Sequence, residues 1–315
     1  MNLSVVNSRA LVGVTAIPVS VEIHLSGGLP SLSIVGMPET AVRESKDRVR
    51  AAILNSGFEF PASRITVNLA PADLPKTGGR FDLPIALGLL AASGQLDGEA
   101  LQAYEFIGEL ALGGELRSVD GALPTALATL SSARALVVPA VNAAEAGLAE
   151  NCCVYAANTL LQLCNDLASD ERLQRLRTAA PELSIASGSV PDLADVRGQL
   201  QARRALEIAA SGGHNLSLVG PPGTGKSMLA SRLPAIMPGM TLDEALETAS
   251  LTSISNSGFD ETRFRQRPYR SPHHTASGVA LVGGGSQPKP GEVSLAHNGV
   301  LFRNYVAVTQ TTGRG

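Results

Sequence analysis

Residues Leu216–Ser227 read LSLVGPPGTGKS, an apolar run leading into a glycine-rich turn of the pattern G-x-x-x-x-G-K-[ST]. Small residues in such a turn let backbone N–H groups converge on phosphate oxygens, and a helix beginning at the lysine directs the positive end of its dipole toward them. The lysine adds a point charge, and the hydroxyl after it ligates Mg²⁺. The predicted nucleotide-binding residues of this segment are Gly220, Pro221, Pro222, Gly223, Thr224, Gly225, Lys226, Ser227 and Met228, with Ser227 as the metal ligand.

The sequence on both sides of the turn predicts a strand–turn–helix unit. Asn215–Val219 predicts a strand, Met228–Met237 predicts a helix, and Gly198–Ala210 predicts a further helix. The alternative interpretation is a glycine-rich turn that occurs by chance. Such a turn would not explain the strand pattern before it or the helix pattern after it. We therefore predict nucleotide binding, and we treat hydrolysis as a separate function that needs further residues.

The composition is that of a globular protein. Hydrophobic residues make up 44% and charged residues 17% of the 315 residues, and the net charge is −3, which excludes a disordered or polybasic chain. The length is sufficient for two domains. No run reaches the roughly 18 apolar residues of a membrane-spanning helix, so no membrane partner is expected. Cys152, Cys153 and Cys164 have no C-x-x-C spacing, which favours reduced thiols in a cytoplasmic protein over a disulfide or zinc site.

The first half of the chain alternates strand and helix patterns. Period-two alternation or short apolar runs predict strands, and longer periodic runs between turn residues predict helices. The predicted strands are Val19–Leu25, Leu29–Gly36, Arg64–Pro71 and Ala135–Pro139, with a hairpin over Phe106–Val119 that turns at Gly113–Gly114. The predicted helices are Leu83–Ala92, Asn158–Ala168 and one that has Pro38 in its first turn, ends before Gly57 and has Val42, Val49, Ile53 and Leu54 on its apolar face.

A change of composition separates the two halves. Residues 178–192, TAAPELSIASGSVPD, mix Ser, Gly, Pro and Ala, which is typical of a linker. We therefore predict a first domain over residues 1–177 and a second over residues 193–315.

Four long segments resemble the YifB/ComM family of magnesium-chelatase-like AAA+ ATPases. They are SLSIVGMPETAVRESKDRVRAAILNSG (Ser31–Gly57), VNLAPADLPKTGGRFDLPIALGLLAASG (Val67–Gly94), LVGPPGTGKSMLASRLPAIMP (Leu218–Pro238) and YRSPHHTASGVALVGGGSQPKPGEVSLAHNGVLF (Tyr269–Phe302). The resemblance extends over almost the whole of residues 1–302.

The resemblance implies both a fold and a function. The implied fold is an α+β domain similar to the Lon peptidase domain and the GHMP kinases, followed by an α/β P-loop domain of the AAA+ type. The implied cofactors are ATP and Mg²⁺, the implied assembly is a hexameric ring, and the implied function is an ATP-driven motor for DNA branch migration in natural transformation. Two alternatives stay open: a magnesium-chelatase-type ATPase subunit, and a non-enzymatic interaction module.

The resemblance also assigns the segment Asp195–Gln199, DVRGQ, to the element that packs beside adenine. In that interpretation Val196 forms an apolar wall for the base. The alternative is an ordinary helix start capped by Asp195, since aspartate is a favoured cap residue.

A peptidase function in the first domain is not expected. Lon-like catalysis needs a nucleophilic serine with a nearby lysine, and the corresponding loop, Pro75–Pro84 (PKTGGRFDLP), contains no serine. We therefore expect Lys76 to be a solvated loop charge.

A basic segment near residue 265 is a candidate for DNA contact. Arg263, Arg265, Arg267 and Arg270 fall within eight residues and are interleaved with aromatic residues, a composition that can hold phosphates and stack bases. A solvated hairpin or a subunit contact is the alternative. The adjacent histidines at positions 273 and 274 would face opposite ways on a strand, so no metal site is expected.

The acidic pair that an AAA+ ATPase uses for hydrolysis is absent from the sequence. In the family the run GVLF continues into Leu-Asp-Glu, whereas here Gly299–Phe302 continues as RNYVAVTQTTGRG, and Glu292 is the last acidic residue. We expect an incomplete AAA+ domain, truncated before the Walker B motif, with no catalytic residues, weak or no nucleotide binding and no appreciable turnover.

Overall fold

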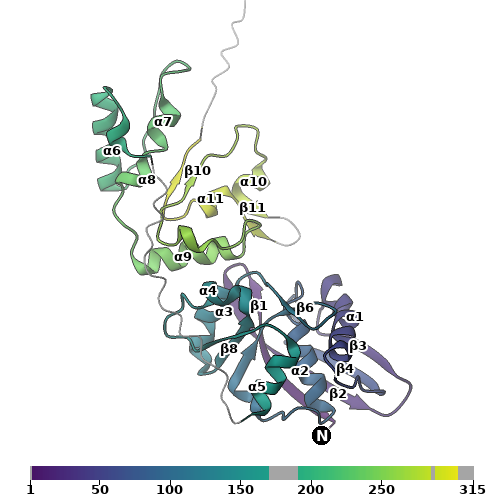
Figure 1. The fold of residues 1–315 in the computed structure, drawn as a ribbon. Helices are drawn as coiled ribbons and strands as arrows, with labels where there is room; N and C mark the ends of the chain where they lie inside the picture. Colours follow the sequence, from purple (N-terminus) through teal and green to yellow (C-terminus); the bar gives the residue numbers. More distant parts are fainter. Residues whose placement is uncertain (1, 170–190, 285–287, 304–315) are drawn as a thin grey trace, which may run out of the picture. The chain divides into compact units, whose positions relative to one another are not determined.

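The chain divides into two compact units, residues 1–182 and 183–315, and each is described here by itself (Figure 1). The structure is a computed structural model that describes residues 2–169, 191–284 and 288–303. The predicted linker, residues 178–192, lies outside the described residues except for its last two. The predicted tail after Phe302 is described only as far as Arg303.

A seven-stranded mixed sheet forms the first unit. The strand order is β3-β4-β2-β1-β5-β8-β9. β2 runs antiparallel to both β1 and β4, whereas the remaining neighbours in the sheet are parallel. The strands are β1 (Leu3–Val12), β2 (Thr15–Ser26), β3 (Ser31–Val35), β4 (Arg64–Ala70), β5 (Tyr104–Phe106), β8 (Ala135–Pro139) and β9 (Val154–Ala157).

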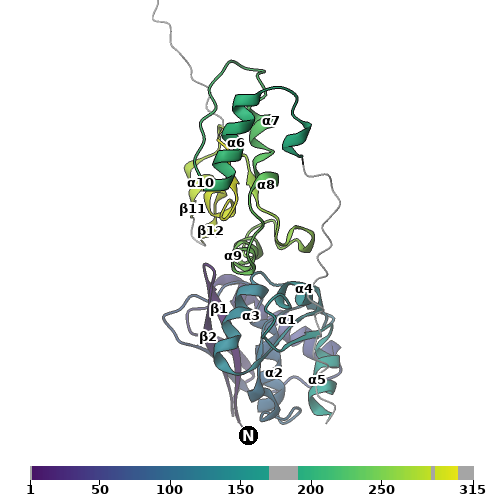
Figure 2. The same ribbon diagram turned by 90° about the vertical axis from the view of Figure 1, so that its left-hand side faces the viewer.

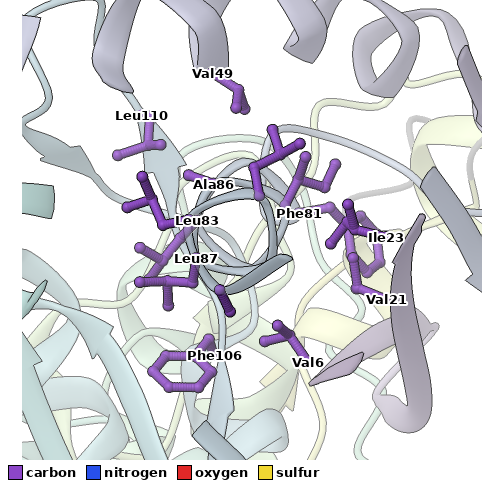
Figure 3. Packing of buried hydrophobic residues seen from close by; sticks show 14 of the residues in the cluster. Val6, Val21, Ile23, Val49, Phe81, Leu83, Ala86, Leu87, Phe106 and Leu110 are labelled. Carbon is purple, nitrogen blue, oxygen red and sulfur yellow. The ribbon is translucent and has the colours of Figure 1, made fainter. Parts of the chain in front are cut away.

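Five helices accompany the sheet in the described part of the first unit: α1 (Thr40–Asn55), α2 (Asp82–Ala92), α3 (Ala122–Thr129), α4 (Ala143–Ala146) and α5 (Leu160–Ala168). Every residue of α2 is buried. Figure 3 shows α2 end on, with apolar side chains from the sheet, from α1 and from the short hairpin around it. A helix that is apolar on all sides must be covered on all sides, so α2 is the centre of this core.

The two faces of the sheet carry different helices. Val6 of β1 packs against α2. A side chain at position 88 of α2 would collide with Ile23 and crowd Val6, so only glycine fits there. Arg9, three residues later, points to the other face, where Glu105 pairs with it and also accepts a hydrogen bond from Thr129 of α3. Because successive side chains of a strand alternate, α2 and α3 cover opposite faces of the sheet.

The central strand β1 is absent from the sequence prediction. It pairs with β2 over its whole length, yet it contains Ser8 and Arg9, which are polar and buried. The Arg9 guanidinium is satisfied by two hydrogen bonds to Glu105, at 2.5 and 3.1 Å, and by one to the carbonyl of Ala16. A buried ion pair of this kind disrupts the apolar alternation by which strands are recognised.

The other elements predicted for the first unit are largely confirmed. The strands predicted at Val19–Leu25, Leu29–Gly36, Arg64–Pro71 and Ala135–Pro139, and the helices at Leu83–Ala92 and Asn158–Ala168, are present with small shifts of their ends. The hairpin predicted at Phe106–Val119 pairs only β6 (Glu109–Leu110) with β7 (Leu116–Arg117).

Three details of the first-unit prediction are wrong. Helix α1 begins at Thr40, so Pro38 lies before the helix. Pro38 instead forms an isolated parallel β-bridge with Lys76. Leu54 is 49% exposed and does not belong to the apolar face of that helix. Lys76 is buried instead of solvated; its ammonium donates to the carbonyl of Pro71, and burial lowers its pKa.

The second unit has helices but only two-residue strands in its described part. The helices are α6 (Leu200–Gly212), α7 (Lys226–Ala230), α8 (Leu233–Ile236), α9 (Leu242–Ser253), α10 (Gly278–Val282) and α11 (Glu292–Leu295). The strands β10 (Tyr269–Arg270) and β13 (Val300–Leu301) pair in parallel, and β11 (Gly283–Gly284) pairs with β12 (Lys289–Pro290).

The strand predicted at Asn215–Val219 is not formed. This segment pairs with no strand in the described ranges, and Val219 is 95% exposed. A strand requires neighbours that satisfy its backbone N–H and C=O groups, so an apolar run alone does not produce one. The helix predicted at Met228–Met237 is also wrong in detail, because α7 ends at Ala230 and α8 begins at Leu233.

Asp82 makes the stability of the first unit depend on pH. Its carboxylate accepts two hydrogen bonds from Arg48 and one from the N–H of Leu110, but burial raises its pKa to about 6. The unfolded value is about 3.9, so the ionised form is disfavoured by folding, and stability is lost as the pH rises from 4 through 6. We expect Asp82 to add roughly 2–3 kcal/mol to the free energy of unfolding at pH 4 relative to pH 7.

Urea denaturation across this pH range measures the effect. The variant Asp82→Asn should lack this component, whereas Asp47→Asn, at an exposed position of α1, should keep it. Identical pH profiles for the wild type and Asp82→Asn would contradict the assignment.

Candidate nucleotide-binding site

The phosphate loop has the backbone conformation that its glycines allow. Gly223 and Gly225 both adopt φ of +82°, a left-handed conformation that other residues adopt only with strain. At Gly220 a side chain would crowd the hydroxyl of Thr224 at 3.2 Å. The loop ends at Gly225, and α7 begins at Lys226. The predicted Gly and Lys residues of the motif are therefore brought together in one turn between the extended segment and the helix.

Lys226 closes this turn. Its Nζ donates to the carbonyls of Gly220 and Pro221, both at 2.8 Å, and the hydroxyl of Thr224 donates to the same Pro221 carbonyl at 2.9 Å. An ammonium group has three protons, so two of them are committed to the loop itself. A phosphate oxygen would take the third proton or compete with these carbonyls for the other two.

The hydroxyl of Ser227 is suited to Mg²⁺. Ser227 is exposed in the first turn of α7 and contributes one oxygen ligand. Mg²⁺ is usually held by one or two protein oxygens, with phosphate oxygens and water completing the shell. No group of three or more His, Cys, Asp or Glu side chains that could hold a metal ion occurs among the described residues. The hydroxyl of Ser227 thus fits a magnesium ion that arrives with a nucleotide.

Val196 lies beside the loop in a small apolar cluster. It is 3% exposed and packs with Leu193, Leu206 and Leu229, so it links the start of α6 to α7 of the phosphate loop. The short turn before it is capped by Asp192, which forms a capping box with Asp195. Asp195 is therefore not the cap residue of α6, as one interpretation of the sequence expected. The contact of Val196 with a base stays a prediction.

The sequence prediction did not identify Gln199 as a residue that contacts the phosphate loop. Gln199 directly precedes α6 and adopts φ of +54°. Its side-chain amide donates to the carbonyl of Thr224 in the phosphate loop at 3.1 Å. The local sequence carries no signal for this contact, because it joins residues 25 positions apart.

The four arginines of the basic segment do not form a free cationic surface. Arg267 donates to the carbonyls of Pro238 and Asn298, both at 2.6 Å, and to Glu244. Arg270 donates twice to Glu292. These two side chains therefore hold the second unit together.

The other two arginines are exposed. Arg263 pairs with Asp260 at 3.3 Å, and Arg265 lies over the ring of Phe264 at 5.9 Å. Exposed pairs of this kind are weak, so both guanidinium groups can be recruited by a phosphate.

The two adjacent histidines were expected on opposite faces of a strand, and that expectation is wrong. His273 and His274 lie in a turn, with ring centroids 4.2 Å apart, and Nδ1 of His273 is 2.7 Å from the hydroxyl of Thr275. In the described ranges they belong to no larger set of metal-ligating side chains.

No helix in the described parts of the chain is long and apolar enough to cross a bilayer.

Comparison with known families identifies both halves of the chain. A profile of the family described as "Magnesium chelatase, subunit ChlI" matches residues 192–310, and one described as "Subunit ChlI of Mg-chelatase" matches residues 21–142. The first match contains the phosphate loop and the basic segment.

Curated relatives extend over nearly the whole chain. An uncharacterised protein named YifB from Salmonella typhimurium is 53% identical over 96% of this chain, and the competence protein ComM of Haemophilus influenzae is also 53% identical over 96%. An uncharacterised protein of Mycobacterium tuberculosis is 44% identical over 94%. The chain spans 59% of the length of the YifB and M. tuberculosis proteins and 60% of that of ComM.

Arg267 should matter more for stability than its neighbours in the basic segment. We expect Arg267→Ala to cost the second unit about 1–2 kcal/mol, because the substitution removes the hydrogen bonds to the carbonyls of Pro238 and Asn298 and the ion pair with Glu244. Arg265→Ala, at an exposed position of the same segment, should change stability by less than about 0.5 kcal/mol. Thermal unfolding of the two variants measures this difference, and equal midpoints would show that the contacts of Arg267 do not stabilise the fold.

Proposed function

Because this chain belongs to the YifB/ComM family of magnesium-chelatase-like proteins, we propose that its second unit binds ATP together with Mg²⁺ at the loop Gly220–Ser227. The observation that carries the proposal is the turn itself. Two glycines at φ of +82° bring the Lys226 ammonium back over the loop, where it donates to two backbone carbonyls of the loop.

Binding would proceed by exchange of hydrogen bonds. The Lys226 ammonium would exchange the carbonyls of Gly220 and Pro221 for phosphate oxygens, which accept stronger, charge-assisted hydrogen bonds. Backbone N–H groups of the glycine turn would bind the remaining oxygens. The hydroxyl of Ser227 would orient Mg²⁺, which supplies positive charge against the phosphates.

For these 315 residues we propose binding with little hydrolysis. A catalytic base has to be free to accept a proton from the attacking water. Glu292, in α11, is instead held by two hydrogen bonds from Arg270, which lower its pKa.

For the whole protein we propose an ATP-driven motor that acts on DNA, assembled as a ring of identical subunits. Support comes from the likeness to a relative named as a competence protein. Arg263 and Arg265 are the residues of the basic segment that can contact DNA phosphates, because Arg267 and Arg270 are bonded within the fold. A magnesium-chelatase-type ATPase subunit is the second candidate, favoured by the description of the two matching family profiles.

Binding of ATP should stabilise the second unit. At a ligand concentration of 100 times Kd the expected gain is about 2.7 kcal/mol, which appears as a rise in the melting temperature. Lys226→Ala should abolish the rise, whereas Lys46→Ala, an exposed lysine on α1, should retain it. A wild-type chain whose melting temperature does not respond to ATP and Mg²⁺ would contradict the proposal.

DNA affinity should depend on the two exposed arginines through phosphate contacts. Each lost contact lowers the slope of log K against log salt concentration by about 0.7–0.9. We therefore expect the variant with both Arg263→Ala and Arg265→Ala to lose about 1.5 from the slope. A control variant with Arg43→Ala and Arg64→Ala, two exposed arginines of the first unit, should keep the wild-type slope. Equal slopes for both variants would exclude the basic segment from DNA binding.

A further inference from the structure

Gln199 adopts a backbone conformation that costs free energy. It is a non-glycine residue at φ of +54° and ψ of +38°, directly after Gly198, which has φ of +70°. Glycine at position 199 would adopt this conformation without strain, whereas glutamine adopts it at a cost. A strained residue of this kind calls for an interaction that only its side chain can make.

The side chain of Gln199 makes one hydrogen bond, and that bond reaches the phosphate loop. Nε2 donates to the carbonyl of Thr224 at 3.1 Å. The helices α6, α7 and α8 lie beside one another in the second unit (Figure 2), and the apolar contact of Val196 and Leu206 with Leu229 holds α6 against α7. The amide of Gln199 therefore joins the start of α6 to the phosphate loop, beside the small apolar cluster that contains Leu206 and Leu229.

The orientation of one peptide group follows from this bond. The peptide between Thr224 and Gly225 is planar and trans, so its C=O and N–H point in opposite directions. With the carbonyl held by Gln199, the N–H of Gly225 points away from α6. No acceptor within the described residues takes this N–H. It is thus a fixed, unused donor directly before Lys226.

We propose that Gln199 is a positioning residue for phosphate recognition: its amide holds the Thr224 carbonyl and thereby aims the N–H of Gly225 at the phosphate chain of the bound nucleotide. This inference rests on the proposed binding of ATP at the loop. In this proposal Gln199 does not contact the base. Its role therefore differs from that of Val196, which was predicted to lie beside the base.

A role in phosphate recognition and a role in the turn alone predict different ATP affinities for Gln199→Gly. Glycine removes the amide and also relieves the backbone strain. If Gln199 only formed the turn, Gln199→Gly would be neutral or stabilising, with unchanged binding. If it positions the loop, the variant should keep its thermal stability without ligand and lose about 3- to 10-fold in affinity for ATP, which corresponds to the loss of one hydrogen bond.

The experiment measures dissociation constants by calorimetry for the full chain with ATP and with inorganic tripolyphosphate, both with Mg²⁺. Gln199→Gly and Gln199→Glu, whose carboxylate cannot donate, should weaken both ligands by the same factor. Gln201→Glu is the matched control, since it makes the same charge change two residues away at an exposed position of α6; it should change either constant by less than about twofold.

Three outcomes would overturn the inference. They are unchanged affinity in both Gln199 variants, a loss for ATP without a loss for tripolyphosphate, and an equal loss in Gln201→Glu. A wild-type chain that binds neither ligand would instead contradict the proposed function on which the inference rests.

Discussion

The hydrogen bonds from the Lys226 ammonium to the carbonyls of Gly220 and Pro221 determine the shape of the candidate site. A charged donor binds a carbonyl more strongly than a neutral one, so these bonds hold the two ends of the glycine turn together. In the proposed function, loop closure and phosphate recognition would use the same protons. A bound triphosphate would draw away the ammonium group that closes the loop, and the Gln199 amide would hold the neighbouring peptide in place during this exchange.

The two units use their charged residues in different ways. In the first unit the pair of Arg9 and Glu105 is buried within the sheet, where removing one partner would leave an uncompensated charge. In the second unit Arg267 and Arg270 join short elements at the surface, because two-residue strands supply few backbone hydrogen bonds. Arginines that resemble a DNA-binding stripe in the sequence are therefore partly structural, and Arg263 and Arg265 are the two of the four that are exposed.

The sequence predicts elements whose pattern is local. Helix α2 and strand β2 were predictable because apolar runs and alternation are visible without knowledge of their neighbours. The likeness of the first unit to Lon peptidases and GHMP kinases stays a prediction. Burial of Lys76 and the bond from Gln199 to Thr224 were not predictable, because each depends on a segment distant in sequence. The segment Asn215–Val219 was predicted as a strand from its apolar run but is not one, because a strand also needs a neighbouring strand to pair with.

The most direct test of the account is a crystal structure of the chain with a non-hydrolysable ATP analogue and Mg²⁺. The account predicts that Nζ of Lys226 leaves the carbonyls of Gly220 and Pro221 and lies within about 3 Å of phosphate oxygens, with the hydroxyl of Ser227 on the metal ion. A nucleotide bound elsewhere, or a bound nucleotide with the lysine still on both carbonyls, would contradict it.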